Sequence, residues 1–455
     1  MSYEYDIAVI GAGVVGAAIA RELSLTALRV VVLEASGDVG TGTSKANTAI
    51  RHTGFDAKPG SLESALLRRG YPLLDRYAKA TGIPLERTGA LLVAWTAAEA
   101  AALDRVVATA EANGYAETRR LDAAELYAAE PHLGPGAQAA LEIPGEGVIC
   151  PFTTPIAFAT EAARNGVDFR FHHRVERAVD DGLRYDLGGV RARWVVNAAG
   201  LGSGDVDRLF GYEEFTVTPR RGELIIFDKL ARPLLNHVLL PVPTERTKGV
   251  LIAPTVFGNV LLGPTAEDVP DRTATATTAA GLAQLREAGR RVLPALLDEE
   301  VTSMYAGLRA ATEHADYQIR AHPDRRYVCV GGIRSSGLSA SMGIAAHVYD
   351  LLCDAGLDID QVRDSAMVGG EGHRVPPVGE TWRRPYADTE LIAANPDYGE
   401  VVCFCERITL GEVRAALRGP VPAPDLDGVR RRTRAGLGRC QGFYCAARLQ
   451  ALVAP

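Results

Sequence analysis

Four cysteines near the C-terminal end of the 455-residue chain have the residue type and spacing of a ligand set for a metal or cofactor. They form a C-x-C pair, Cys403 and Cys405, and a C-x4-C pair, Cys440 and Cys445, with 34 residues between the pairs. Zinc sites usually space paired ligands by two to four residues, so the one-residue gap argues against zinc. A disulfide between Cys403 and Cys405 would be strained. The favoured hypothesis is therefore that the four thiolates hold a metal cofactor other than a zinc ion. A zinc site and four cysteines without a metal are the alternatives.

A second group of chemically informative residues lies at the N-terminal end. Gly11, Gly13 and Gly16 form a G-x-G-x-x-G turn, which follows the apolar run 5–10 and precedes the helical pattern 17–24. A second apolar run then ends at Glu34, 18 positions after Gly16. This order predicts a strand–turn–helix–strand unit that holds a pyrophosphate on backbone N–H groups and a ribose diol on the carboxylate. The charge of Glu34 disfavours a 2′-phosphate, so the pattern fits FAD or NAD.

The composition limits the class of protein. The chain carries 49 basic and 56 acidic residues, a net charge of −7, and is 47% hydrophobic. A protein that binds nucleic acid through its phosphates would usually be basic, so no nucleic-acid partner is expected. Seven cysteines are too few for a secreted disulfide framework, and no run reaches the roughly 18 apolar residues of a membrane helix. Together with the start of a strand close to Met1, this predicts a cytoplasmic protein, compatible with peripheral membrane contact.

The segment after Glu34 resembles a known flavin-contacting loop. It contains Gly42-Thr-Ser44, Asn47-Thr48 and the run 50–62. These residues are similar to those of FAD-dependent glycerol-3-phosphate dehydrogenases and L-2-hydroxyglutarate oxidases, in the D-amino-acid-oxidase-like superfamily. Two further segments, 196–200 and 258–265, resemble the second FAD-binding strand end and a substrate-domain signature of that superfamily. The resemblance implies FAD rather than NAD, held also by Thr43, Ser44, Asn47, Thr48, Val175, Ala199, Gly200, Gly332, Gly337, Leu338 and Ser339.

The resemblance also implies the reaction and its residues. Such flavoenzymes pass a hydride from a carbinol carbon to flavin N5 while a base takes the hydroxyl proton. His52 is the candidate proton acceptor, because its ordinary pKa lies near working pH; a structural or cofactor-contacting role is the alternative. An anionic substrate needs cations, for which the candidates are Arg309, Arg334 and Lys248. The chain departs from the family pattern at Ala310 and Ser336, where prolines are usual, and Arg334 also stands where many relatives carry another polar residue, which weakens the substrate assignment.

The four C-terminal cysteines resemble those of the bacterioferritin-associated-ferredoxin-like [2Fe-2S] domain, which is appended to some glycerol-3-phosphate dehydrogenases. Thr409 and Glu412 form a capping-box pattern that predicts a helix start after Cys405. Nearby arginines are expected to lower the thiolate pKa values, or alternatively to form a solvated helix face or a docking surface: Arg407, Arg430, Arg431, Arg432, Arg434 and Arg439. Cys150, Cys329 and Cys353 lie in apolar stretches, which predicts inert core residues.

These features together predict the architecture: an α/β protein with a Rossmann-type FAD-binding domain, a β-rich α+β substrate domain and a small helical C-terminal [2Fe-2S] domain. The FAD-binding domain is assigned to 1–80, 148–215 and 327–368, and the substrate domain to 81–147 and 216–326. Residues 369–396 are assigned to a linker and 397–455 to the cluster domain.

The resemblance implies an FAD-dependent dehydrogenase of a small anionic 2-hydroxy compound, most similar to glycerol-3-phosphate. Its electrons would pass through a [2Fe-2S] relay to a quinone or an electron-carrier protein. The alternatives are L-2-hydroxyglutarate or an amino or imino acid as substrate, a non-catalytic electron-transfer subunit, and a cluster that only stabilises the tail.

Overall fold

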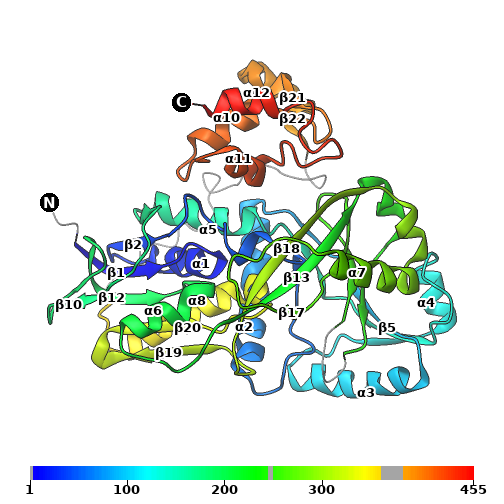
Figure 1. Ribbon diagram of the computed structural model, residues 1–455, viewed down its shortest axis with the longest axis horizontal. Helices are drawn as coiled ribbons and strands as arrows, with labels where there is room; N and C mark the ends of the chain where they lie inside the picture. The colour runs from blue at the N-terminus through cyan, green and yellow to red at the C-terminus, as the bar shows by residue number, and fades with distance from the viewer. Residues whose placement is uncertain (1–3, 244–248, 360–382, 455) are drawn as a thin grey trace.

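The computed structural model describes residues 4–243, 249–359 and 383–454. Lys248 and most of the predicted linker, 369–382, lie outside these ranges. Figure 1 shows a two-part body with a small C-terminal domain above it. Within the described ranges, every helix is too short or too polar to cross a lipid bilayer.

The flavin half of the body is built on an eight-stranded sheet. Its centre is parallel, in the order β9-β2-β1-β12-β20, and its strands are β1 (Glu4–Ile10), β2 (Val30–Leu33), β9 (Asp168–Arg170), β10 (Val179–Asp180), β11 (Tyr185–Asp186), β12 (Arg191–Asn197), β19 (Gln318–His322) and β20 (Tyr327–Gly331). The inner strands β2 and β20 are apolar throughout, as burial on both faces requires. The helices of this half are α1 (Val14–Leu23), α2 (Leu62–Thr81), α5 (Thr153–Arg164), α6 (Ser203–Leu209) and α8 (Gly337–Asp354).

The substrate half is a nine-stranded sheet. Its strands are β5 (Ala90–Ala94), β6 (Arg119–Asp122), β7 (Ala139–Ile143), β13 (Thr218–Phe227), β14 (Val238–Pro241), β15 (Leu251–Pro254), β16 (Val260–Gly263), β17 (Glu267–Asp268) and β18 (Val301–Ala311). Its helices are α3 (Ala97–Ala112), α4 (Ala123–Ala129) and α7 (Ala279–Val292). A third, three-stranded sheet has the strand order β3 (Ile50–Arg51), β8 (Gly147–Ile149) and β4 (Leu85–Glu86). Strands β13 and β18 are the long antiparallel pair. They position the site described below.

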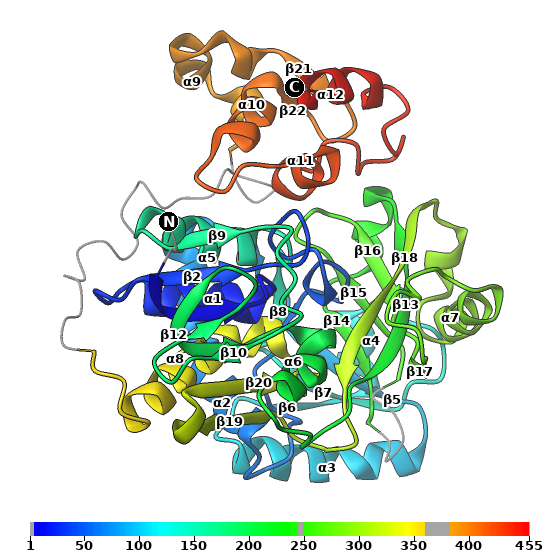
Figure 2. The ribbon, with the colours of Figure 1, turned by 60° about the vertical axis from the view of Figure 1, so that its left-hand side comes forward.

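The small domain has its own apolar core, which includes Val402, Ile408, Val413, Val429 and Leu449. Its elements are α9 (Thr389–Ala394), β21 (Val401–Cys403), β22 (Ile408–Thr409), α10 (Leu410–Arg418), α11 (Leu426–Thr433) and α12 (Ala446–Val453), with short 3-10 turns at Pro385–Ala387 and Pro396–Gly399. Figures 1 and 2 both show α11 on the side of this domain that faces the body. The capping box is confirmed, since Thr409 and Glu412 cap α10 reciprocally.

The predicted fold class is confirmed, while several details differ. Strand β19, predicted in the substrate domain, pairs with β20 in the flavin sheet. Helix α9 lies inside the segment predicted as a linker, because Asp388 caps its first turn. Cys150 and Cys329 are buried as predicted, but Cys353 is exposed, because it lies in the last turn of α8.

Candidate active site and cluster-binding domain

The glycine turn has the geometry that a dinucleotide requires. Gly11 has φ 102°, and a Cβ there would lie 2.5 Å from the carbonyl oxygen of Ala198, so only glycine fits between β1 and the end of β12. A Cβ at Gly13 would have only the Ser44 hydroxyl within 4 Å, which leaves that side of the turn open for a pyrophosphate. At the end of β2, Glu34 Oε2 accepts a hydrogen bond of 2.7 Å from the Ala12 N–H. The turn, the start of α1 and the Glu34 carboxylate therefore fit the nucleotide half of FAD.

The predicted flavin loop is fixed between this turn and strand β18. The Ser44 hydroxyl accepts from the Val14 N–H at 2.9 Å, and the Thr43 hydroxyl donates to the Leu308 carbonyl at 2.8 Å. The Tyr305 hydroxyl donates to the Asn47 carbonyl at 3.0 Å. The structure thus brings together loop residues predicted from the sequence and the strand that carries Arg309.

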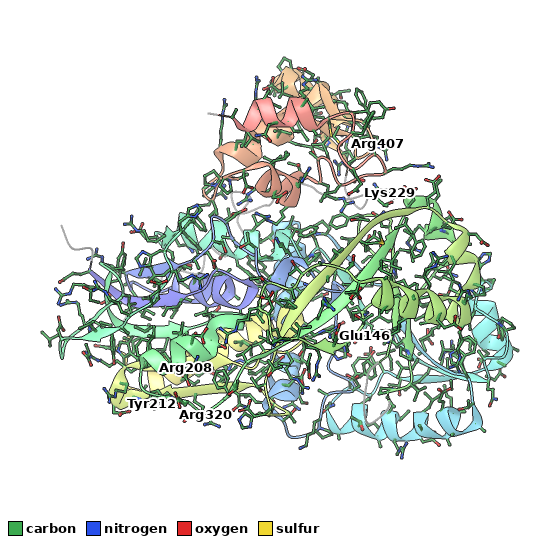
Figure 3. The ribbon with its side chains drawn as sticks, in the orientation of Figure 1. Glu146, Arg208, Tyr212, Lys229, Arg320 and Arg407 are labelled. Carbon is green, nitrogen blue, oxygen red and sulfur yellow. The ribbon has the colours of Figure 1, made fainter. Side chains whose placement is uncertain are left out.

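His52 lies beside Ser339, another predicted flavin contact. Its backbone N–H donates to the Ser339 hydroxyl at 2.8 Å, which joins the loop to the first turn of α8. Its ring lies between two carboxylates: Nδ1 is 3.0 Å from Glu146 Oε1, and Nε2 is 2.9 Å from Asp56 Oδ1. Glu146 is fully buried and also accepts from the backbone and hydroxyl of Thr53. Figure 3 shows Glu146 inside the body.

These contacts set the charge of the histidine. Burial lowers the pKa of His52, but the charge of Glu146 and the hydrogen bonds to Asp56 and Glu146 outweigh it and raise the pKa to about 10. At neutral pH both ring nitrogens therefore carry protons and donate to carboxylates. An imidazolium has no lone pair to accept a further proton. The contacts favour the alternative in which His52 positions the loop over the one in which a free imidazole is the base.

A Glu146→Gln substitution tests this pair. The raised pKa of His52 means that the pair stabilises the fold fully below the ordinary histidine pKa and that this stabilisation is lost as pH rises through about 10. We expect the variant to lose about 3 kcal/mol of unfolding free energy at pH 6.5, because one partner of a buried pair is removed, and less near pH 10. Urea unfolding at both pH values measures this. Glu125→Gln, at a half-exposed carboxylate paired with Arg119, is the control; a loss independent of pH would contradict the charge assignment.

The predicted anion-binding residues are placed unequally. Arg309 lies on β18, directly opposite Arg220 of β13. Within the described residues no carboxylate pairs with it; its Nη2 donates only to the Thr265 carbonyl, at 3.3 Å. Burial and the charge of Arg220 lower the pKa of Arg309 to about 10, so it remains a cation at neutral pH. Arg334 donates to the Ala315 carbonyl at 3.1 Å. Its charge, like that of Arg220, lowers the pKa of Asp268, so Arg334 lies toward the end of β13 that carries Arg220.

The remaining predicted flavin residues lie at turns of the flavin sheet. Gly200 follows Ala199 after β12, where the Ala199 N–H donates to the Asn197 side chain at 3.2 Å. Gly332 follows β20 directly, and Gly337 and Leu338 open α8. Val175 is a core residue packed with Val31 and Leu33, beneath the end of β2.

Sequence reasoning missed two residues beside His52. Glu146 sits in a Gly-Glu-Gly turn before β8, where only its burial distinguishes it from a surface residue. Arg51 is fully buried and pairs with Asp75 and the Tyr71 hydroxyl. Asp75 and Tyr71 lie on α2, about 20 positions further along the chain, so the sequence gives no local sign of these contacts. The only signal for a buried arginine at this position is its place in a short strand among apolar residues.

The four C-terminal cysteines lie in two contacting pairs. Cys440 contributes to the shifted pKa of Cys405, and Cys403 to the raised pKa of Cys445, so each C-x-C thiol lies close to one of the C-x4-C thiols. The Gly436 N–H donates to the Cys403 sulfur at 3.4 Å. Across the described ranges no group of three or more His, Cys, Asp or Glu side chains that could hold a metal ion is found. Two thiol pairs instead suit a two-iron cluster, which takes four cysteines.

Burial, backbone N–H groups and the neighbouring thiols, rather than arginines, shift the pKa values of Cys405, Cys440 and Cys445. The pKa of Cys440 is lowered, first by the N–H of Tyr444, whereas burial and Cys403 raise the pKa of Cys445 to about 12. The alternative of a solvated helix face does not hold for Arg431, Arg432 and Arg434, because all three are buried.

These arginines face the body of the molecule. The Asp38 carboxylate, 2% exposed, pairs with Arg431 at 2.6 Å and with Arg432 at 2.7 Å. Arg434 pairs with Glu406 at 3.0 Å, and its guanidinium lies 3.9 Å from the centre of the Phe257 ring. Figure 3 shows Lys229, which pairs with Glu406 at 3.2 Å, on the body below the small domain. The small domain is therefore docked on both halves of the body: on Asp38, close after the end of β2, in the flavin half, and on Lys229 and Phe257 in the substrate half.

Comparison with known families agrees with this geometry. The profile described as "FAD dependent oxidoreductase" matches residues 6–351. The chain belongs to this family. A second profile, the "BFD-like [2Fe-2S] binding domain", matches residues 401–454. This FAD-dependent oxidoreductase therefore has two cofactors, FAD and a [2Fe-2S] cluster. The residues assigned above to each cofactor remain predictions.

Three proteins illustrate the similarity. A glycerol 3-phosphate dehydrogenase of Caloramator mitchellensis is 34% identical over 99% of this chain and 94% of its own length. A mitochondrial L-2-hydroxyglutarate dehydrogenase of Arabidopsis thaliana is 27% identical, over 75% of this chain and 82% of its own. The structure of L-alpha-glycerophosphate oxidase from Mycoplasma pneumoniae with FAD bound has a TM-score of 0.73 and 29% identity, over 77% of this chain and 95% of that one.

Proposed function

We propose that this FAD-dependent oxidoreductase dehydrogenates glycerol-3-phosphate. The observation that carries the proposal is Arg309, a partly buried arginine without a carboxylate partner among the described residues, on the strand that touches the flavin loop. An unpaired cation in such a place is costly unless a bound anion neutralises it. The dehydrogenase of Caloramator mitchellensis, which is similar over nearly the whole chain including the small domain, supports the same substrate.

Each residue of this chain would have a separate task. Arg309 holds the phosphate, and Arg334 adds positive charge on the same side. His52, fixed by Glu146, orients the loop and holds the Asp56 carboxylate, which would accept the hydroxyl proton of the substrate. FAD, when bound, supplies the hydride acceptor. A His52→Ala variant should then turn over more slowly while flavin remains bound.

L-2-hydroxyglutarate is the second candidate substrate. It is also a dianion with a carbinol carbon, and the Arabidopsis thaliana relative bears that activity in its name. Because the cations at Arg309 and Arg334 would hold either a phosphate or a carboxylate, the site itself does not separate the two.

An anaerobic titration separates the candidates. The purified protein is mixed with glycerol-3-phosphate, L-2-hydroxyglutarate or an amino acid, and the oxidised-flavin absorbance is followed. Bleaching by glycerol-3-phosphate alone supports the proposal, and bleaching only by L-2-hydroxyglutarate overturns it in favour of the second candidate. If dithionite bleaches the band but no substrate does, the protein is a non-catalytic electron-transfer subunit.

We propose in addition that the cluster is a relay. Electrons from a two-electron oxidation can then leave singly to a one-electron carrier or a quinone. Electron paramagnetic resonance (EPR) tests this: a reduced-cluster signal after substrate addition supports the relay. A signal that dithionite produces and substrate does not would leave the cluster a structural role.

A further inference from the structure

The two segments that carry the four cysteines expose three aromatic rings. Phe404 lies between Cys403 and Cys405 and is 72% exposed, while Phe443 and Tyr444 precede Cys445 and are 83% and 75% exposed. The rings of Phe443 and Tyr444 meet edge to face, 5.2 Å apart. These are the three most exposed of the large apolar side chains in the described residues. Exposed aromatic surface of this kind marks an interaction site.

The patch formed by Phe404, Phe443 and Tyr444 adjoins the thiols that a redox partner must approach. Cys405 is exposed and Cys440 partly exposed, whereas Cys403 and Cys445 are buried beneath them. The small domain is docked on the body by Arg431 and Arg432, and also by Glu406 and Arg439, which lie next to Cys405 and Cys440 and pair with Lys229 and Glu300 of the body. The three aromatic rings and Cys405 nevertheless remain exposed to solvent.

The charges around the patch are positive. Segments 403–407 and 436–448 contain three arginines, Arg407, Arg439 and Arg448, and a single carboxylate, Glu406. Glu406 is buried against Lys229 and Arg434, so its charge is already compensated. The three arginines are exposed, and the carboxylates that pair with Arg439 and Arg448 are themselves half-exposed. Exposed pairs of this kind rearrange at little cost when a partner binds.

The whole small domain shows the same bias. Residues 397–455 contain nine arginines, no lysine and six carboxylates, although the chain as a whole carries a net charge of −7. Aromatic rings in segments that also carry the exposed Arg407, Arg439 and Arg448 match a partner surface that combines apolar side chains with carboxylates. Such charges steer the encounter, and the aromatic rings then anchor the complex.

We propose that the Phe404–Phe443–Tyr444 patch is the docking surface for an acidic one-electron carrier protein, which takes electrons leaving through the cysteine segments. This inference rests on the proposed function of the chain as a dehydrogenase with a relay. Oxidation of one hydroxyl to a ketone releases two electrons and two protons. Two carrier molecules each accept one electron, and the protons pass to water.

The test uses the holoenzyme and two probe carriers. The soluble haem domain of cytochrome b5 is acidic, and mitochondrial cytochrome c is basic. Phe443→Ser/Tyr444→Ser is compared with Leu183→Ser, which removes a side chain that is 71% exposed in the β10–β11 turn. Flavin and cluster content are checked by absorbance and EPR. The enzyme is first reduced with substrate, and its reduction of each carrier is then followed by stopped flow. Binding of each carrier is measured by surface plasmon resonance.

We expect the double variant to bind cytochrome b5 at least tenfold more weakly and to reduce it at least tenfold more slowly. The Leu183→Ser variant should behave like wild type, and the rate at which the double variant reduces a small dye should be unchanged. A Phe404→Ser variant should show the same direction, and wild-type reduction of cytochrome b5 should fall as salt is added. An unchanged rate and affinity in the double variant, or a preference for the basic carrier, would overturn the proposal. The proposal would also be overturned if the double variant lost binding to anionic lipid vesicles, or lost the ability to form a dimer, while its binding and reduction of cytochrome b5 stayed as in wild type.

The failure of this proposal can be distinguished from that of the dehydrogenase function. If glycerol-3-phosphate does not bleach the flavin, the dehydrogenase proposal fails, and the carrier experiment is then run on protein reduced with one equivalent of dithionite. If substrate reduces the dye normally but the patch variants transfer electrons to cytochrome b5 as wild type does, only the docking surface is wrong.

Discussion

Replacing Arg309 with leucine is expected to lower kcat/KM for glycerol-3-phosphate by about 10²- to 10³-fold, or about 3–4 kcal/mol of transition-state stabilisation. The reason is that Arg309 is a partly buried cation whose only hydrogen bond in the described residues is to a carbonyl. Removing it leaves the phosphate without its nearest countercharge. Anaerobic stopped-flow measurement of flavin reduction over a range of substrate concentrations gives kcat and KM separately.

Two further variants make the Arg309 experiment decisive. Arg309→Lys keeps the charge but not the planar fork, so we expect it to recover part of the loss. Arg193→Leu removes an arginine that is 53% exposed in the flavin half and should change nothing. Flavin content is compared in all three. A wild-type rate in Arg309→Leu would move the anion site elsewhere, and an equal loss of bound flavin would show that Arg309 supports the cofactor.

The parts of this protein that could be predicted from the sequence are those encoded locally. The glycine turn and Glu34 lie within one strand–helix–strand unit, and the contact of Glu34 with the turn follows from the short connection between β1 and β2. The capping box at Thr409 is encoded within four residues, for the same reason. The positions of the four cysteines are likewise set by two short segments.

The contacts that could not be predicted join residues far apart in the sequence. His52 and Glu146 are separated by 94 positions, and the pair forms only because β3 and β8 lie side by side. Asp38 and Arg432 are separated by 394 positions. An arginine run has the same pattern whether it faces water or a buried aspartate, so the sequence alone left a solvated face for α11 open as an alternative. Burial, which decides the matter, depends on how the small domain docks.

This docking gives the second large effect. An Asp38→Asn substitution leaves Arg431 and Arg432 buried without a countercharge, which costs about 3–5 kcal/mol in the docked state. We expect the small domain to separate from the body, because the arginines can then be hydrated. Small-angle scattering and limited proteolysis between residues 383 and 397 detect the separation, and the rate of substrate-dependent cluster reduction should fall while flavin reduction is unchanged.

The pH dependence and a mutant cycle distinguish this ion pair from a general loss of stability. Burial raises the pKa of Asp38, but hydrogen bonds and charges from Arg432 and Arg431 outweigh it, and the pKa lies below its ordinary value. The stabilisation is therefore present above the ordinary aspartate pKa of about 3.9 and is lost as pH falls through the lowered value. Wild type should undock only in acid, and Asp38→Asn should be undocked throughout. Asp181→Asn, at an exposed carboxylate paired with Arg191, should remain docked like wild type. Adding Arg432→Gln to Asp38→Asn should cost less than the two single changes together; strict additivity would mean that the pair does not hold the domains together.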